Sequence, residues 1–237
     1  MRNWFIYDGK NSKDYGVYIS GMGTYNAPER DIESLEIPGR NGELTIDNGR
    51  YKNIKVTYPA FIIKDFNANI SAFRNMLLTH RGYFKLADTY HPDEYRLARY
   101  SGGFTAEVLD SHRAGQFDIN FDCYPQRFLN DGDKPIELSA NGSIYNKEDT
   151  IALPIIRAYG NGTLTINGIS IVITGASGTY TDLDCELMEA YKDTLATSKN
   201  ANITLTDGKF FSLIPGANTI SFTGLSKIEI TPKWWRL

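Results

Sequence analysis

Three acidic residues at alternate positions form the cluster in this chain that most suggests catalysis. Asp182, Asp184 and Glu186 would project from one face of a strand. Paired carboxylates of this kind could serve glycoside hydrolysis or bind a cation. We favour the simpler interpretation of a solvated strand face, with the apolar residues between and after the acids buried behind it: Leu183, Cys185 and Leu187. A glycosidase also needs a carboxylate from a second segment, so we assign no catalytic residue.

The histidines and cysteines lack the spacing of a metal or nucleophile site. His80, His91 and His112 form no HExxH motif and have no histidine three or four residues away. His91 with Asp93 and Glu94 is the nearest approach to a ligand set, and His80 is expected at a helix end, where a cation suits the dipole. The two cysteines are not in a CxxC motif. We therefore expect no metal, no cofactor and no enzymatic activity.

Two adjacent tryptophans, Trp234 and Trp235, could contact a sugar or a protein partner. Aromatic rings stack on the apolar faces of sugars and are enriched at interfaces. In the alternative interpretation, one tryptophan anchors the last strand to the core while its neighbour faces outward.

Composition indicates a folded, mostly β protein. The 237 residues include 25 Lys and Arg against 28 Asp and Glu, a net charge of -3 that argues against a protein whose main task is coating nucleic acid. The 3 Trp, 15 Tyr and 12 Phe favour strands and broad interfaces. No apolar run approaches the length that spans a bilayer, and the first residues lack an apolar signal region, so we expect neither a secretory signal nor membrane insertion.

The hydrophobic pattern predicts strands and one clear helix. Residues 116–123 alternate apolar and polar side chains, which is typical of an amphipathic strand. Asn69 could cap a helix over residues 70–80, with Gly82 just beyond its end. The dipeptide Asn167-Gly168 predicts a tight hairpin.

A polar, turn-rich stretch at residues 130–135 predicts a boundary between two domains, residues 1–129 and 130–237. The first contains the helix together with strands, so we expect an α+β domain. The second has short strands with regularly spaced turn signals, which indicates a β-sandwich. The expected fold class is mainly β with one clear helix.

Three segments together resemble the distal tail protein family of long-tailed, non-contractile bacteriophages. They are the loop PGRNGEL at residues 38–44, PGANTI at 215–220 and the terminal TPKWW at 231–235. The resemblance extends over essentially the whole chain.

This resemblance implies a structural role in the virion, at the tail tip, after assembly in the host cytoplasm. The first domain would form a hexameric ring joining the tail tube protein to the tail-tip protein, with DNA passing through the ring without sequence-specific binding. The second would be a galectin-like β-sandwich that projects outward and carries a receptor-binding protein or meets host cell-wall carbohydrate.

The loop after Ile37 is the expected interface with a ring neighbour or the tail tube. Its proline fixes φ and its two glycines permit positive φ, so we expect an ordered turn or an exposed loop. Its residues are Pro38, Gly39, Arg40, Asn41, Gly42, Glu43 and Leu44. Two other functions remain open on the sequence: a cell-wall glycosidase built on the acidic cluster, and a carbohydrate-binding module acting through exposed aromatics.

Overall fold

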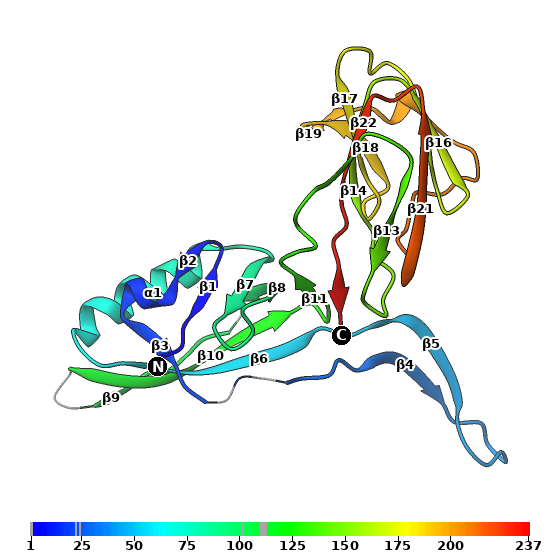
Figure 1. Cartoon of the computed structure of the whole chain (residues 1–237). Coiled ribbons are helices and arrows are strands. Elements are labelled where there is room, and N and C mark those ends of the chain that lie inside the picture. Colours follow the sequence, from blue (N-terminus) through cyan, green and yellow to red (C-terminus); the bar gives the residue numbers. More distant parts are fainter. Residues whose placement is uncertain (1, 22, 24, 101, 110–112) are drawn as a thin grey trace. The chain divides into compact units, whose positions relative to one another are not determined.

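The computed structural model describes residues 2–21, 23, 25–100, 102–109 and 113–237. The chain divides into two compact units, residues 1–127 with residue 237, and residues 128–236. Strands dominate both, and the described residues contain one α-helix (Figure 1). The prediction of a mainly β fold with one helix is confirmed.

The first unit is built on an antiparallel sheet in which β6 and β10 form the longest pair. Their register runs from Gly115 opposite Ile62 to Cys123 opposite Ile54. The sheet order is β2-β1-β7-β8-β10-β6-β3, with β9 beside the start of β10. The strands are β1 (Phe5–Tyr7), β2 (Lys10–Asn11), β3 (Val17–Ile19), β6 (Ile54–Ile62), β7 (Phe84–Asp88), β8 (Glu94–Tyr100), β9 (Glu107–Leu109) and β10 (Ala114–Cys123), with a 3-10 turn over Ser12–Tyr15.

The alternation predicted for residues 116–123 is confirmed, because every second side chain of β10 enters the core. Phe121 lies among other rings there: its centroid is 5.0 Å from that of Tyr7 and 5.5 Å from that of Phe5. The polar residues between the buried ones face away from the helix side of the sheet, and they form the outer face of β6 and β10.

The helix α1 spans Phe66–Thr79, so the prediction that Asn69 caps it was wrong. Asp65 is the N-cap, and the backbone N–H of Asn69 already donates to the Asp65 carbonyl at 3.1 Å. Burial of Phe66 in the core explains the earlier start, since it fixes a turn that local sequence signals do not mark. His80 stands at the C-terminal end as expected, with Nε2 2.9 Å from Asp8 Oδ2.

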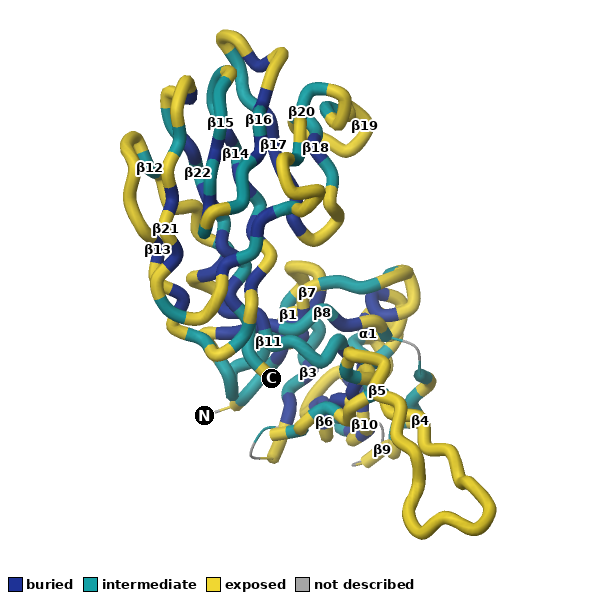
Figure 2. Tube along the Cα trace, turned by 90° about the vertical axis from the view of Figure 1, so that its right-hand side faces the viewer, coloured by how far each residue is buried: buried dark blue, intermediate teal, exposed yellow. Residues whose placement is uncertain are grey.

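The second unit consists of two antiparallel sheets around one apolar core. A six-stranded sheet runs β12-β22-β14-β17-β18-β19, and a five-stranded sheet runs β13-β21-β15-β16-β20. Their inward side chains meet in a single cluster that includes Ile156 and Ile230 from one sheet and Leu164 and Ile171 from the other. Figure 2 shows the alternation of buried and exposed positions along these strands.

The hairpin predicted at Asn167-Gly168 is confirmed, and it joins β15 to β16. Asn167 and Gly168 both have positive φ, 50° and 84°, as this tight turn requires. The strands are β11 (Arg127–Leu129), β12 (Ile136–Leu138), β13 (Gly142–Asn146), β14 (Ile155–Tyr159), β15 (Gly162–Ile166), β16 (Ile169–Ile173), β17 (Tyr180–Asp184), β18 (Glu189–Lys192), β19 (Thr194–Ser198), β20 (Ile203–Leu205), β21 (Gly216–Thr223), β22 (Lys227–Thr231) and β23 (Trp235–Arg236), with a 3-10 turn over Asn200–Asn202.

Candidate functional site

A hairpin of β4 (Arg30–Leu35) and β5 (Leu44–Tyr51) forms a two-stranded sheet of its own. Within the described chain, each of these strands pairs only with the other. Nearly all of its residues are exposed, as the yellow of this segment in Figure 2 shows. A free two-stranded hairpin is marginally stable in water, so this one is suited to a partner surface.

One face of the hairpin presents apolar side chains to solvent. Leu35 lies opposite Leu44, and Glu33 lies opposite Ile46. Because side chains alternate between the faces of a strand, these four share one face. Leu35, Leu44 and Ile46 are 55 %, 40 % and 48 % exposed, so the face is a contiguous apolar strip without a cover.

Ion pairs across the hairpin hold its two strands in register. The guanidinium of Arg30 lies 3.0 Å from Asp47, and that of Arg50 lies 2.7 Å from Asp31. At the base of the hairpin the Lys52 amide donates to the Glu29 carbonyl at 2.8 Å. The base is therefore closed by its own backbone, and the hairpin leaves and rejoins the unit at nearly one point.

The predicted interface loop, Pro38–Leu44, forms the tip of this hairpin, and all of its residues are exposed. Gly39 and Gly42 have φ of 81° and 82°, and the Arg40 amide donates to the Ile37 carbonyl at 3.1 Å. Of the two predicted alternatives, an ordered turn or an exposed loop, the structure shows a turn whose residues are also exposed. Its role as an interface stays a prediction.

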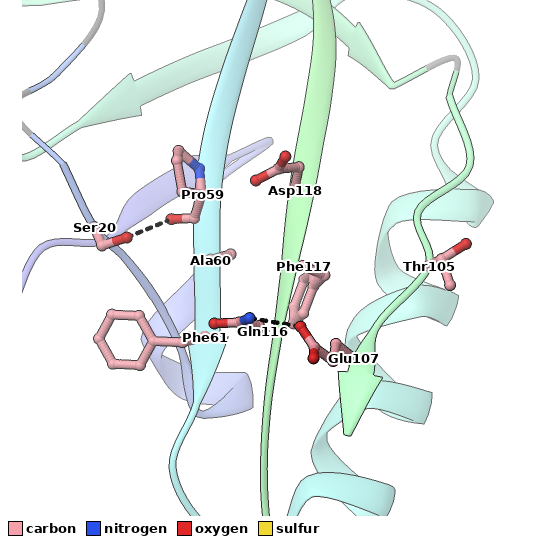
Figure 3. Close-up of a pocket in the computed structure, with 9 residues that line it drawn as sticks. All are labelled: Ser20, Pro59, Ala60, Phe61, Thr105, Glu107, Gln116, Phe117 and Asp118. Atoms are coloured by element: carbon pink, nitrogen blue, oxygen red, sulfur yellow. Dashed lines mark hydrogen bonds between the residues drawn. The ribbon is translucent and has the colours of Figure 1, made fainter. Parts of the chain in front are cut away.

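A shallow hollow lies on the outer face of β6 and β10; we call it the β6–β10 hollow (Figure 3). Pro59 and Phe61 of β6 supply its apolar part, and Glu107 and Asp118 supply carboxylates. Gln116 Nε2 donates to Glu107 Oε2 at 2.6 Å. The remaining lining residues are Ser20, Ala60, Thr105 and Phe117.

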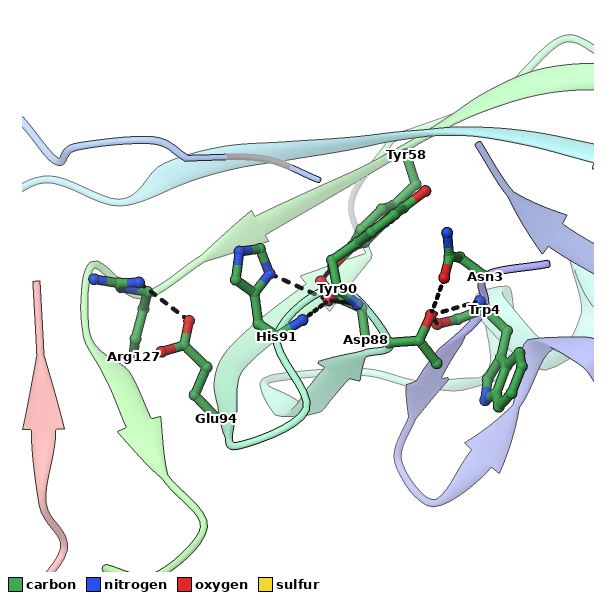
Figure 4. A network of polar contacts seen from close by, with 9 residues as sticks. Asn3, Trp4, Tyr58, Asp88, Tyr90, His91, Glu94 and Arg127 are labelled. Atoms are coloured by element: carbon green, nitrogen blue, oxygen red, sulfur yellow. Dashed lines mark hydrogen bonds and ion pairs between the residues drawn. The ribbon is translucent and has the colours of Figure 1, made fainter. Parts of the chain in front are cut away.

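The partly buried polar network around Asp88 is structural (Figure 4). Asp88 Oδ1 accepts the amides of Tyr90 and His91, both at 2.9 Å, and lies 3.2 Å from His91 Nδ1. Asp88 Oδ2 accepts the Tyr58 hydroxyl at 2.6 Å. Burial, together with this carboxylate, raises the pKa of Tyr58 well above its ordinary value. The network fixes the loop after β7 against the sheet.

The structure separates the residues considered as a metal set. The His91 ring contacts Asp88, while Glu94 pairs with Arg127 at 3.2 Å. Among the residues that the structure describes, no group of three or more potential ligands could hold a metal ion. His112 lies outside the described residues.

The acidic cluster of the second unit is part of the fold, and the prediction of a solvated face was wrong. Asp182 and Asp184 are both buried. Arg157 binds Asp182 in a two-bond fork, at 2.7 and 3.1 Å, from the neighbouring strand β14. Asp184 Oδ1 accepts the amides of Glu186 and Leu187, which turns the chain out of β17.

This turn explains a second error. The strand ends at Asp184, so the alternation stops and Leu187 is 52 % exposed, whereas Leu183 and Cys185 are buried as expected.

Asp182→Asn is expected to destabilise the second unit by about 2–3 kcal/mol, because Arg157 then loses its buried partner charge. Chemical denaturation of the variant checks this. Glu186→Gln, which removes an exposed carboxylate of the same cluster, is the control and should stay within about 0.5 kcal/mol of the parent. Equal losses for both variants would contradict a structural role for Asp182.

The two terminal tryptophans occupy different environments. Trp234 is buried in the core of the second unit, and its carbonyl accepts the Leu129 amide at 2.9 Å. Trp235 is half-buried, and its indole Nε1 donates to the Ile151 carbonyl at 2.9 Å. A sugar or partner contact at these residues therefore depends on the exposed part of Trp235.

Both cysteines are buried and free, and burial raises the pKa of Cys123 and of Cys185 to about 12. The thiolate is the reactive form, so both thiols should be inert near neutral pH. We expect a thiol reagent at pH 8 to label the native protein negligibly and to label two thiols per chain in denaturant. Rapid labelling of the native protein would contradict this burial.

The helices of the described residues are too short or too polar to cross a membrane.

Comparison with known proteins reveals phage relatives. Residues 10–123 match the family model of the phage tail protein RIFT-related domain. The crystal structure of the SPP1 Dit protein (gp 19.1) superposes with a TM-score of 0.74 at 17 % identity, covering 99 % of each chain. SPP1 Dit is described as a paradigm of the hub adsorption apparatus in phages that infect Gram-positive hosts. A chain of the phage p2 baseplate in its activated conformation matches with a TM-score of 0.54 at 11 % identity, over 100 % of this chain and 98 % of that one.

No protein with curated annotation matches the chain by sequence. The structural likenesses therefore show the fold, and the family model independently matches residues 10–123, within the first unit.

Proposed function

We propose that this chain is a siphovirus distal tail and baseplate protein, and that it builds a hexameric hub ring through its first unit. The ring joins the tail tube protein on one side to the tail-tip protein on the other, and DNA passes through it. The second unit projects outward and carries a receptor-binding protein or meets host cell-wall carbohydrate. The protein is then a structural component of the virion, at the tail tip, assembled in the host cytoplasm, and not an enzyme.

The free hairpin β4–β5 is the observation that carries this proposal. A closed ring of identical subunits needs a head-to-tail interface, in which one patch of each subunit meets a different patch of the next. The β4–β5 hairpin is a separate sheet from the main sheet of the first unit, and it exposes Leu35, Leu44 and Ile46. It supplies the projecting half of such an interface. Contiguous apolar side chains left exposed in this way are typical of assembly surfaces.

The alternative functions gain no support from their residues. The glycosidase hypothesis depends on carboxylates of which Asp182 is paired with Arg157 and Asp184 is engaged by two backbone amides. The carbohydrate-binding module would use terminal tryptophans of which Trp234 is packed in the core.

The mass of the purified full chain in solution tests the proposal. Light scattering over a concentration series should give a species of six times the chain mass of 26.7 kDa. A monomer at every concentration, persisting after the tail tube and tail-tip proteins are added, would contradict the ring.

A further inference from the structure

The hairpin supplies only one of the two patches that a head-to-tail ring requires. We propose that the β6–β10 hollow is the second patch, and that it receives the hairpin tip of a neighbouring copy of this chain with Arg40 against Asp118. This inference rests on the proposed ring, and it identifies the surface of each subunit that receives the neighbour's hairpin.

Arg40 is the hairpin cation that is left for a partner. Arg30, Arg50 and Lys52 each face a carboxylate of the hairpin or its base, at 3.0, 2.7 and 3.9 Å. Arg40 makes no ion pair with any described residue, and it stands exposed on a tip loop between two glycines of positive φ. The hairpin thus pairs its other cations with its own carboxylates, and its tip presents the Arg40 guanidinium beside the exposed residues Glu36 and Glu43.

Asp118 is the matching carboxylate. It is exposed on the outer face of β10 and has neither a hydrogen bond nor an ion pair with the part of the chain that the structure describes. Glu107 reinforces the negative charge, since Gln116 engages only one of its two carboxylate oxygens. The hollow is therefore lined by one unpartnered carboxylate on β10 and one half-partnered carboxylate on β9 (Figure 3).

The apolar part of the hollow matches the apolar residues of the tip. Pro59 and Phe61 lie beside the carboxylates, and the tip carries Ile37 and Pro38 next to Arg40. A guanidinium can stack on an aromatic ring while its N–H groups bind a carboxylate in a planar fork. Charge pairing of this type at an interface rim chiefly fixes the partner and the register. Apolar contact of the hairpin strip with the neighbour then contributes most of the affinity.

A charge swap tests the pair. Asp118→Arg and Arg40→Asp should each raise the concentration needed for half-assembly of the ring at least tenfold, and the double variant carrying both changes should recover most of that loss. Asp93→Arg, at an exposed carboxylate of the same unit outside the hollow, is the control and should leave assembly unchanged. Both sites are exposed, and circular dichroism checks that every variant folds.

The outcomes separate the two proposals. If the parent chain forms the ring and neither single change weakens it, the hollow is not the receiving patch and the ring stands. If both single changes weaken the ring but the double variant does not recover, Arg40 and Asp118 meet different partners and the pairing is overturned. A parent chain that never assembles, even with its tail partners, overturns the proposed ring itself.

A crosslink gives a second readout that does not depend on charge. Mixing the Arg40→Cys protein with the Asp118→Cys protein under mild oxidation should give a disulfide-linked dimer between the two variants, because the native thiols are buried. Mixing Arg40→Cys with Asp93→Cys should not. Equal yields from the two mixtures would overturn the assignment of the hollow.

Discussion

A chain lacking residues 30–51 is expected to fold and to remain monomeric. The hairpin makes its strand pairs only with itself within the described chain, so its removal leaves the sheet of the first unit intact. The 2.8 Å bond from the Lys52 amide to the Glu29 carbonyl already holds the two cut ends together, and a short Gly-Ser linker can join them without strain. The shortened chain cannot form the ring, because it lacks the hairpin that supplies the projecting half of the interface.

The measurement pairs thermal melting with light scattering. The shortened chain should melt within a few degrees of the parent and should show the chain mass at every concentration. A matched control keeps the hairpin and changes only its other face, where Ile32 lies opposite Asp47; Ile32→Ser should still form the ring. A ring that persists without the hairpin would refute its role in assembly.

Phe121→Ala should destabilise the first unit by about 3–5 kcal/mol, the range for removing a large buried aromatic side chain. Phe121 is fully buried, and its ring lies within 5.0–6.2 Å of the rings of Phe5, Tyr7, Tyr58 and Tyr100. These side chains come from strands on both sides of β10, so the cavity would open at the centre of the sheet and collapse poorly.

Phe61→Ala is the control for this prediction, because Phe61 is half-buried on the outer face of β6. This substitution should lower the free energy of unfolding by about 1 kcal/mol. Chemical denaturation that follows the first unit's transition compares the two variants. Similar losses would mean that the aromatic cluster is not the principal core of the unit.

The periodic parts of the fold could be predicted from the sequence. Apolar and polar residues alternate strictly over residues 116–123. An alternation of that length fits a strand with one buried face. The start of α1 could not be predicted in this way. Asn69 is a good local cap, but burial of Phe66 against the sheet, a contact with distant residues, adds a turn before it.

Only part of the candidate site could be predicted from the sequence. Pro38, Gly39 and Gly42 predicted an exposed turn, since these residues dictate backbone conformation locally. That the strands flanking this turn pair with nothing else follows from the whole topology, and no local pattern encodes it. The same holds for the β6–β10 hollow, which brings Pro59 and Asp118 together across a strand pair.

The error at Asp182 has a similar cause. The alternating acidic residues predicted a solvated strand face. The register between β14 and β17 instead places Arg157 opposite Asp182, and their pairing allows the Asp182 carboxylate to be buried. A prediction from the segment alone cannot include a partner 25 residues away.

Electron-microscope class averages of the purified 237-residue chain would show the ring itself. We expect closed rings of six subunits around a central opening, with each hairpin reaching across to the next subunit at the β6–β10 hollow. Separate subunits at all concentrations, or rings in which the hairpins contact no neighbour, would contradict this expectation.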